Sequence, residues 1–454
     1  MAGTRLAPPE PLAPSPHALG VWELAWPTIV ASATQTLVRW ADIKMVGSLG
    51  MDAVGGVSGA GFVYWLMQSV AMAVTTGLVA LIARAIGRRD LDLADATLRQ
   101  GITLGTLFGA VSLAIGYPMR RLLIEMYGVE AALVDYGASY LGWLLAGNIP
   151  FTLTFVFAAA LRAAGDSRTP LYVGVAANVL NIFLNWVLIY GNLGAPALGV
   201  AGAGIASSLA MVFQVAVFWG LWRARRLRLK PRGTGFIPDL SLWRRILYVG
   251  YPATLEVGLW HVGLLFFMRI MSAYGTAEFV AYNIGAQILA LSFLPGQGFA
   301  MAASTLVGQH LGDGHPERAA RSGWRSLAGG VVALSINGVL IVALAEPISR
   351  WFLDDAEVVG LTVDFILILG LAQPLMAVEF VLGGALRGAG DTRFPLGVVF
   401  VGLFLCRLIP ATVAYSVFHA PIQIVWSALL FDYAVKAILL TFRFARGRWR
   451  EIQV

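Results

Sequence analysis

The sequence predicts an all-α integral membrane protein with twelve transmembrane helices, arranged as two parallel repeats of six helices. Apolar residues make up 58% of the chain and charged residues only 13%, with a mean hydropathy of +0.75. Soluble domains are roughly 45–50% apolar and about 25% charged. Spanning segments must satisfy their own backbone hydrogen bonds, and the long apolar runs show no two-residue alternation, so helices are predicted rather than a β-barrel.

The two repeats are marked by one ten-residue stretch that occurs twice. It reads LRAAGDSRTP at 161–170 and LRGAGDTRFP at 386–395, and seven of the ten positions are identical. The offset is 386 − 161 = 225 residues, about half of the 454-residue chain. The same offset pairs Pro27 with Pro252 and Gly50 with Gly275. We therefore expect two homologous bundles rather than short solenoid repeats.

Each half contains six apolar runs, and a span needs about 20 residues. The predicted spans are 22–46, 55–83, 98–117, 132–160, 170–192 and 198–222, then 246–272, 279–307, 323–345, 358–386, 395–415 and 421–444. Because six is even, both halves enter the membrane from the same side, which predicts parallel repeats. The polar stretches that begin at Gly87 and Gly312 are interpreted as short interfacial helices.

Basic residues predict the orientation. Outside the spans, arginine and lysine gather in the termini and the even-numbered connections, whereas the odd-numbered connections hold Arg120, Arg121 and Arg350. The positive-inside rule therefore places both termini in the cytoplasm of a multi-pass protein of the cell's inner membrane.

The predicted domains are a disordered cytoplasmic tail (1–21), an N-terminal lobe (22–222), a basic linker (223–245), a C-terminal lobe (246–444) and a cytoplasmic tail (445–454). The Pro-rich start of the chain lacks the features of a signal peptide. The linker's charge is expected to fix topology and to contact anionic lipid, so no nucleic-acid partner is predicted.

The repeated motif falls in the connection between helices four and five of each half. Its glycine frees the backbone for a turn, its aspartate is expected to pair with the arginines of the motif, and its proline suits the first turn of the next helix. A direct role in gating is the alternative. The residues assigned to these turns are Arg162, Gly165 and Asp166 in the first copy and Arg387, Gly390 and Asp391 in the second.

Three polar residues share one face of the first helix. Gln35, Arg39 and Asp42 lie at i, i+4 and i+7. A charge at bilayer depth costs about 2.5–3.5 kcal/mol on insertion scales, so an intramembrane carboxylate is a functional candidate. The alternative is that Asp42 only pairs with Arg39 or Lys44 near the end of the helix.

The fifth helix adds a stripe of amides. Asn178, Asn181 and Asn185 repeat at i, i+3 and i+7, and Ser207 adds a hydroxyl from the sixth helix. Together with Asp42 they predict a polar pocket around a single carboxylate. Asparagine also joins membrane helices by hydrogen bonds, which is the alternative role.

The second half does not copy this chemistry. Phe267 stands at the position equivalent to Asp42 and Cys406 at that of Asn181, so an ion site is expected in the first half alone. The candidates for the substrate cavity are Gln35, Arg39, Glu256, His261 and Glu379. Glu256 and His261 are each open between function and packing. A further cluster, Arg407 with the i, i+4 pair Asp432 and Lys436, is interpreted as structural.

Several function classes lack their motifs. None of the three lysines follows glycine, so the sequence holds no phosphate-binding Walker A loop. The five histidines show no spacing typical of a metal site, and no catalytic triad stands out. We expect no catalytic residues, no metal and no cofactor, hence no enzyme.

The motifs taken in order carry a family resemblance over nearly the whole chain, 22–444. The motifs that carry the resemblance are Pro27 followed by WADIKMVGSLG, the twin LRxAGDxRxP turns, NVLNIFLNWVLIYG before GVAGAGIASS, and YNIGAQILALSFLPGQGFAMAASTLVGQHLG. The pattern resembles the multidrug and toxic compound extrusion (MATE) family, in particular its DinF-like prokaryotic branch. The resemblance implies two six-helix lobes in a V and antiport of organic cations or amphiphiles against protons or sodium ions. It also implies an ion-responsive site, matched by Asp42, Asn181, Asn185 and Ser207.

Asn185 departs from that pattern, which carries aspartate there, and so favours one titrating group and proton coupling. The hypothesis is antiport in which Asp42 alternates between charged and protonated states. The alternatives are a flippase for lipid-linked oligosaccharides, which Arg39, Arg269 and Arg407 in a central cavity would support, and an intramembrane enzyme. Expected partners are small organic cations or amphiphiles and membrane lipids, with a monomer as the assembly.

Overall fold

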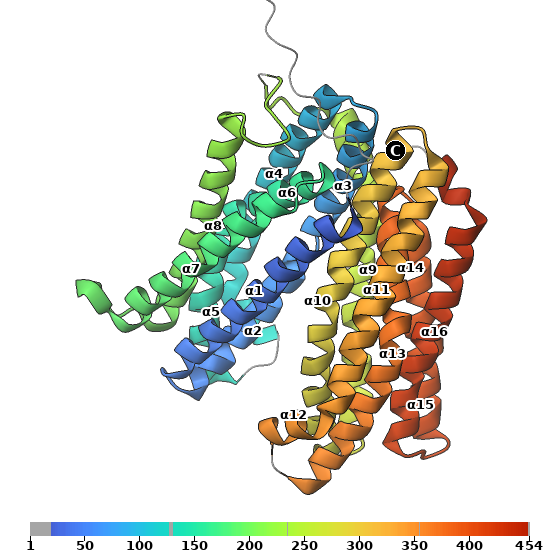
Figure 1. Cartoon of the computed structure of the whole chain (residues 1–454). Coiled ribbons are helices and arrows are strands. Elements are labelled where there is room, and N and C mark those ends of the chain that lie inside the picture. Colours follow the sequence, from blue (N-terminus) through green and yellow to red (C-terminus); the bar gives the residue numbers. More distant parts are fainter. Residues whose placement is uncertain (1–19, 127–129, 234, 354, 453–454) are drawn as a thin grey trace, which may run out of the picture.

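The computed structural model describes residues 20–126, 130–233, 235–353 and 355–452, and helices form nearly all of this part (Figure 1). Nine of the described helices are long and apolar enough to cross a membrane, and two bent helix pairs bring the number to eleven. Helix α1, which carries the polar residues of the first span, completes the predicted twelve. Of the tail predicted for 1–21, residues 1–19 lie outside the described part, and α1 begins at Val21.

The first half contains six spans built from eight helices. They are α1 (Val21–Gly47), α2 (Met51–Gln68) with α3 (Ala71–Gly87), α4 (Leu91–Met126), α5 (Ala131–Ala146) with α6 (Asn148–Ala163), α7 (Arg168–Tyr190) and α8 (Gly199–Arg223).

The second half repeats this order. It comprises α9 (Leu240–Ser272), α10 (Thr276–Gly312), α11 (Pro316–Ala343) followed by the short α12 (Ala345–Phe352), α13 (Ala356–Gly388), α14 (Arg393–Phe400) continued by a π-helical segment (Val401–Leu408) and α15 (Ile409–Ser416), and α16 (Ile422–Arg446).

The two halves form the arms of a V (Figure 1). The blue-to-green first half and the yellow-to-red second half meet near α3 and α10, at the end where the chain terminates, and spread apart toward the opposite end. Helix α10 packs on α1 and α3, and α9 packs on α3, so the first helices of both halves help to hold the arms together.

Two spans of the first half are bent where their counterparts are continuous. The axis turns by 45° between α2 and α3 and by 55° within the α5–α6 span. Gly147 lies at the second bend, where a Cβ would overlap Ser208 of α8, and Pro150 in the next turn has no amide hydrogen to donate. Each predicted span, 55–83 and 132–160, is therefore a broken helix.

Glycines allow a close approach of the arms. A Cβ at Gly87 would overlap the Gln309 carbonyl, and a Cβ at Gly312 would overlap the Arg84 carbonyl. These positions are equivalent in the two repeats. The crossing of α3 and α10 is therefore a pseudo-symmetric contact that side chains larger than hydrogen would push apart.

Two hydrogen bonds beside this crossing join the halves; their donors are equivalent in the two repeats, and their acceptors differ by one position. Arg84 Nη2 donates to the carbonyl of Ala389 at 2.8 Å, and Gln309 Nε2 donates to the carbonyl of Ala163 at 2.8 Å. Both acceptors lie at the C-terminal end of a helix, where backbone carbonyls lack partners within the helix. We call this pair the crossing bonds; each caps a turn motif of the opposite half.

The stretches interpreted as separate interfacial helices are instead the first turns of α4 and α11. Helix α9 also begins within the predicted linker, at Leu240. The Asp239 carboxylate caps it by accepting from the backbone N–H groups of Ser241 (2.9 Å) and Leu242 (3.2 Å). These bonds, with one from the Ser241 hydroxyl, lower the pKa of Asp239.

Candidate functional site

Asp42 of α1 and the amides of α7 meet inside the first half. Asn185 Nδ2 donates to Asp42 Oδ1 at 2.5 Å, and the Asn185 side chain is fully buried. In the orientation that satisfies both ends of its amide, Asn181 donates to the same carboxylate oxygen at 3.1 Å and accepts from the Ser207 backbone at 3.3 Å. Two neutral amides therefore support the carboxylate, and neither can neutralise it.

Tyr140 of α5 completes this group, which we call the Asp42 cluster: Asp42, Asn181, Asn185, Ser207 and Tyr140. Its hydroxyl lies beside the Ser207 side chain and within the electrostatic influence of Asp42 and Arg39. The motif search missed Tyr140 because a single tyrosine in an apolar run carries no periodic signal. Comparison of the two repeats offers one signal: the second half has Phe365 at the equivalent position, so the hydroxyl is specific to the first half.

Three other sequence candidates lie at the margin of this cluster. Gln35 and Arg39 are exposed on α1, consistent with a face that is not packed against neighbouring helices. Asn178 is half-buried on α7, and within the described residues its side chain makes no hydrogen bond. The amide stripe therefore divides into two members that contact the cluster and one that does not.

Helix α1 connects this cluster to the other half. Near its start, Trp22 packs on Phe299 of α10, with ring centroids 6.3 Å apart. Ala25 and Ile29 of α1 lie against Gly298 of α10. Near its end, Asp42 contacts α7, and Tyr190 of α7 donates to the Met45 carbonyl at 3.0 Å. One helix thus carries the carboxylate at one end and an interlobe contact at the other.

The second half neutralises its buried charges. Asp432, fully buried, pairs with Arg407 at 2.5 Å and with Lys436 at 3.1 Å, and Lys436 also pairs with Glu379 at 3.2 Å. The π-helical segment brings Gly402 so close that a Cβ there would overlap Asp432 and Lys436. We call these four charged residues the C-lobe charge cluster. Two acids and two bases balance.

The remaining cavity candidates also have partners. Glu256 of α9 accepts from Arg387 Nη1 at 3.1 Å. His261 is buried beside Trp65 of α2, with ring centroids 4.3 Å apart, and its Nδ1 lies 2.7 Å from the Val257 carbonyl while Nε2 has no partner. The structure therefore places Glu256 and Glu379 in ion pairs and His261 in an aromatic contact between the halves, rather than grouping them around a cavity.

Comparison with known proteins follows the same division into two halves. The sequence model of the MatE family matches residues 27–187 and 252–413, one match in each half. The chain belongs to the MatE family. It is 30% identical over 438 residues to a probable multidrug resistance protein NorM of Thermotoga maritima, covering 94% of this chain and 92% of the relative. A protein of the same name from Mesorhizobium japonicum is 30% identical over 443 residues, covering 93% and 92%.

Solved structures share the fold. A superfamily transporter from Pyrococcus furiosus, described as having a binding pocket of reversed polarity that suggests a different function, superposes with a TM-score of 0.89 at 21% identity, covering 97% of this chain and 98% of that one. An outward-facing multidrug resistance MATE transporter superposes with a TM-score of 0.87 at 22% identity, covering 96% and 98%. The V-shaped MATE fold is confirmed, and the assignment to the DinF-like branch stays a prediction.

The twin turn motifs of this MATE protein share their backbone but not their partners. Gly165 and Gly390 have φ values of +83° and +87°, in the left-handed region that favours glycine. Asp166 accepts from the Thr169 backbone (3.0 Å) and hydroxyl (2.7 Å), whereas Asp391 pairs with Arg443 of α16 at 2.8 Å. The aspartates thus stabilise the next helix start or a neighbouring helix, instead of pairing with the arginines of their own motifs.

The arginines of the motifs differ as well. Arg387 pairs with Glu256 of α9. Arg162 contributes its backbone carbonyl, which accepts from Thr305 Oγ1 of α10 at 3.1 Å. Both copies of the motif therefore join their own turn to another part of the bundle.

Proposed function

We propose that this MATE efflux transporter exports organic cations or amphiphiles in exchange for protons, with Asp42 as the coupling carboxylate. The observation that carries the proposal is that partly or fully buried carboxylates have different partners in the two halves. Asp42 is held by two neutral amides, whereas the buried acids of the C-lobe charge cluster are paired with bases. An acid without a paired base can gain a proton or attract a cation without breaking an ion pair.

The charged form of Asp42 would attract the substrate. With Asn181 and Asn185 donating to it, the carboxylate keeps its negative charge in a partly buried site, and a cation in the adjacent space would be stabilised by that charge. Protonation removes the negative charge, and with it the electrostatic attraction that holds the cation. Because both ligands act on one group, proton and drug would compete.

Helix α1 can couple the protonation state of Asp42 to the arrangement of the two arms of the V. Its first turns pack on α10 of the second half, and its last turns pack on α7 of the first half. A change in the hydrogen bonds of Asp42 therefore acts on a helix that both arms contact. Differential stability of the two arrangements of this helix would provide the population shift that alternating access requires.

The proposal includes the orientation and assembly. The linker, the turn motifs and the C-terminus belong to the cytoplasmic side of the inner membrane, because the arginines gather there. The two arms of one chain supply both walls of the transport path, so a monomer suffices.

The test is transport of ethidium by purified protein in liposomes, with a pH gradient and a sodium gradient imposed separately. Wild type should transport with the pH gradient, and Asp42→Asn should lose coupled transport while keeping its folded elution profile. Asp52→Asn is the matched control, because Asp52 is an exposed acid in the first turn of α2 and lies outside the Asp42 cluster.

Full transport by Asp42→Asn would refute the role of Asp42. Transport driven by sodium alone would keep the carboxylate and replace the coupling ion. The flippase alternative loses one of its three supporting arginines, because Arg407 is paired with buried Asp432. Failure to transport any cation under either gradient would favour it nevertheless.

A further inference from the structure

The first turns of α4 and α11 are equivalent in the two repeats but are covered differently. On α4, the linker lies across the helix. Asp95 accepts from the backbone N–H groups of Arg232 (3.1 Å) and Gly233 (3.3 Å), and Gln100 donates to the Ile237 carbonyl (2.8 Å) and accepts from Asp239 (3.0 Å). An acid and an amide on this helix thus hold an extended segment of backbone.

On α11 the same positions have lost these groups. At the offset of 225 residues, Ala320 replaces Asp95, Trp324 replaces Arg99 and Arg325 replaces Gln100. No acid or amide remains at these three positions to hold a peptide backbone. In place of a bound linker, the structure has an open pocket of about 470 Å³ lined by Glu317, Ala320, Arg321, Trp324, Arg325, Ala328 and Arg450.

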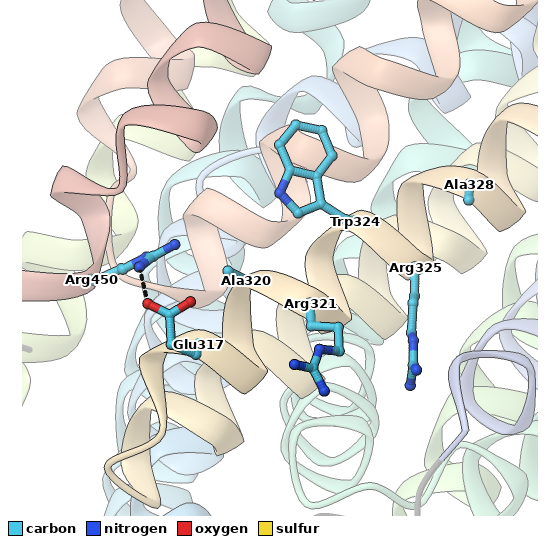
Figure 2. A pocket seen from close by; sticks show the side chains of 7 residues that line it. All are labelled: Glu317, Ala320, Arg321, Trp324, Arg325, Ala328 and Arg450. Carbon is cyan, nitrogen blue, oxygen red and sulfur yellow. Dashed lines mark hydrogen bonds and ion pairs between the residues drawn. The ribbon is translucent and has the colours of Figure 1, made fainter.

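The pocket presents positive charge. Figure 2 shows Arg321 and Arg325, one helical turn apart, extending to the same side of α11. Within the described part of the chain, neither guanidinium forms an ion pair or a hydrogen bond, so their donors are available. The third arginine, Arg450, comes from the C-terminal segment and pairs with Glu317 at 2.5 Å at the rim. Three guanidinium groups against one carboxylate leave a net positive site.

The C-terminal segment fixes the position of Arg450. Trp449 is fully buried and stacks on Phe444 of α16 with ring centroids 4.7 Å apart, and its indole donates to the Phe444 carbonyl at 2.8 Å. Trp324 packs edge-on against the same Phe444 at 5.2 Å. The aromatic packing therefore attaches the basic rim of the pocket to both α11 and α16.

The pocket lies where α11 changes from a polar to an apolar helix. The arginines stand in the polar first turns of α11, and beyond Ala328 the helix is the apolar span that ends at Ala343. Trp324 is 38% exposed, as expected for tryptophan at a membrane interface. A ligand here would meet guanidinium groups at one end and acyl chains at the other.

We propose that this pocket binds the headgroup of an anionic phospholipid, with Arg321 and Arg325 on the phosphate and Ala328 beside the start of the acyl chains. Paired guanidinium groups match phosphate oxygens in geometry and charge, and basic pockets at the cytoplasmic ends of membrane helices are suited to such headgroups. The lipid takes the place that the linker occupies on the first half. It would join α11 and the C-terminal segment without entering the transport path.

The test measures binding of dioctanoylphosphatidylglycerol to the purified full-length protein by calorimetry in detergent, with dioctanoylphosphatidylcholine and inorganic phosphate as the other two probes. Wild type should bind the anionic lipid, and the double variant Arg321→Gln, Arg325→Gln should bind it at least tenfold more weakly. The matched control, Arg88→Gln with Arg244→Gln, removes two exposed arginines elsewhere and should bind as wild type does.

A third variant separates a lipid from a free anion. Ala328 is exposed, so Ala328→Phe fills the acyl end of the pocket without overpacking the core and should weaken the lipid but not phosphate. Inorganic phosphate binding as tightly as the lipid would overturn the lipid assignment. The site would be overturned if the neutral lipid bound as tightly as the anionic lipid, or if the control variant lost as much affinity as the double variant. It would also be overturned if wild type did not bind the anionic lipid.

Discussion

Asp42 and Phe267 occupy equivalent positions in the two halves, and their surroundings differ in the same sense. Tyr140 stands near Asp42, whereas its counterpart Phe365 contacts Tyr282 with ring centroids 5.5 Å apart, and Phe267 packs on that Tyr282 at 5.6 Å. One scaffold thus holds a polar cluster in the first half and an aromatic core in the second. The two halves share the order of their helices, and their side chains differ in chemistry at these equivalent positions.

The halves also differ in how they hold buried charge. The second half links Arg407, Asp432, Lys436 and Glu379 in a chain of three ion pairs, so neutralising any one of them leaves one buried charge uncompensated. The first half leaves the Asp42 carboxylate to two neutral amides. The difference teaches that burial of a charge by itself does not single out a residue here; the absence of a paired base singles out Asp42, and we propose it as the coupling carboxylate for that reason.

The largest effect is expected from Asp432→Asn. It leaves Arg407 without its acidic partner and Lys436 with Glu379 alone in a buried site, and breaking a buried pair costs about 3–5 kcal/mol. The free energy of unfolding, measured by equilibrium unfolding in mixed micelles, should fall by that amount. The control is Asp364→Asn, because Asp364 accepts one hydrogen bond from Gln423 at 3.0 Å and should lose much less. Equal losses would remove the special status of the C-lobe charge cluster.

The next effect is on transport. Asn185→Leu removes the amide that donates to Asp42, a charge-assisted bond of about 1.5–3 kcal/mol. The transport rate in liposomes should fall at least tenfold, while the variant folds and elutes as wild type does. Asn178→Leu is the matched control on the same stripe and should transport nearly normally. If both variants transport alike, the asparagines serve packing alone.

A smaller effect should be shared by both halves. Arg84→Met and Gln309→Met each remove one crossing bond and leave a helix-end carbonyl without its donor, at a cost of about 1–2 kcal/mol. The two variants should lose similar free energy of unfolding, because the donors are equivalent in the two repeats. The exposed neighbour provides the control Arg88→Met, for which a change within about 0.5 kcal/mol is expected. A loss confined to one variant would contradict that equivalence.

The smallest effect tests the turns. Gly165→Ala and Gly390→Ala force a Cβ into the left-handed region, at about 1 kcal/mol each. Thermal unfolding should show nearly equal decreases in Tm. Gly397→Ala lies in a helix with nothing within 4 Å of the added Cβ, so its Tm should not fall. Unequal decreases would mean that the different partners of Asp166 and Asp391, rather than the shared backbone, dominate the turns.

The sequence alone determined the class and architecture of the chain. Composition required a membrane protein, twelve apolar runs gave the spans, and the repeated motif gave the two halves, because each of these depends on local hydrophobicity or on a direct comparison of residues. Asp42, Asn181, Asn185 and Ser207 were found for the same reason. Their types and helical spacing are visible in the chain, and the structure brings them together.

Only the tertiary structure decided which partners those residues have. Asp391, Glu256 and Glu379 each gained a partner from another helix, whereas spacing along one helix reveals neighbours within that helix only. Tyr140 was missed because its position is set by the packing of α5 against α2 and α8. The bends near Ser69 and Gly147, and the pocket that α11 leaves open, likewise depend on how separate helices meet, which local sequence patterns do not encode.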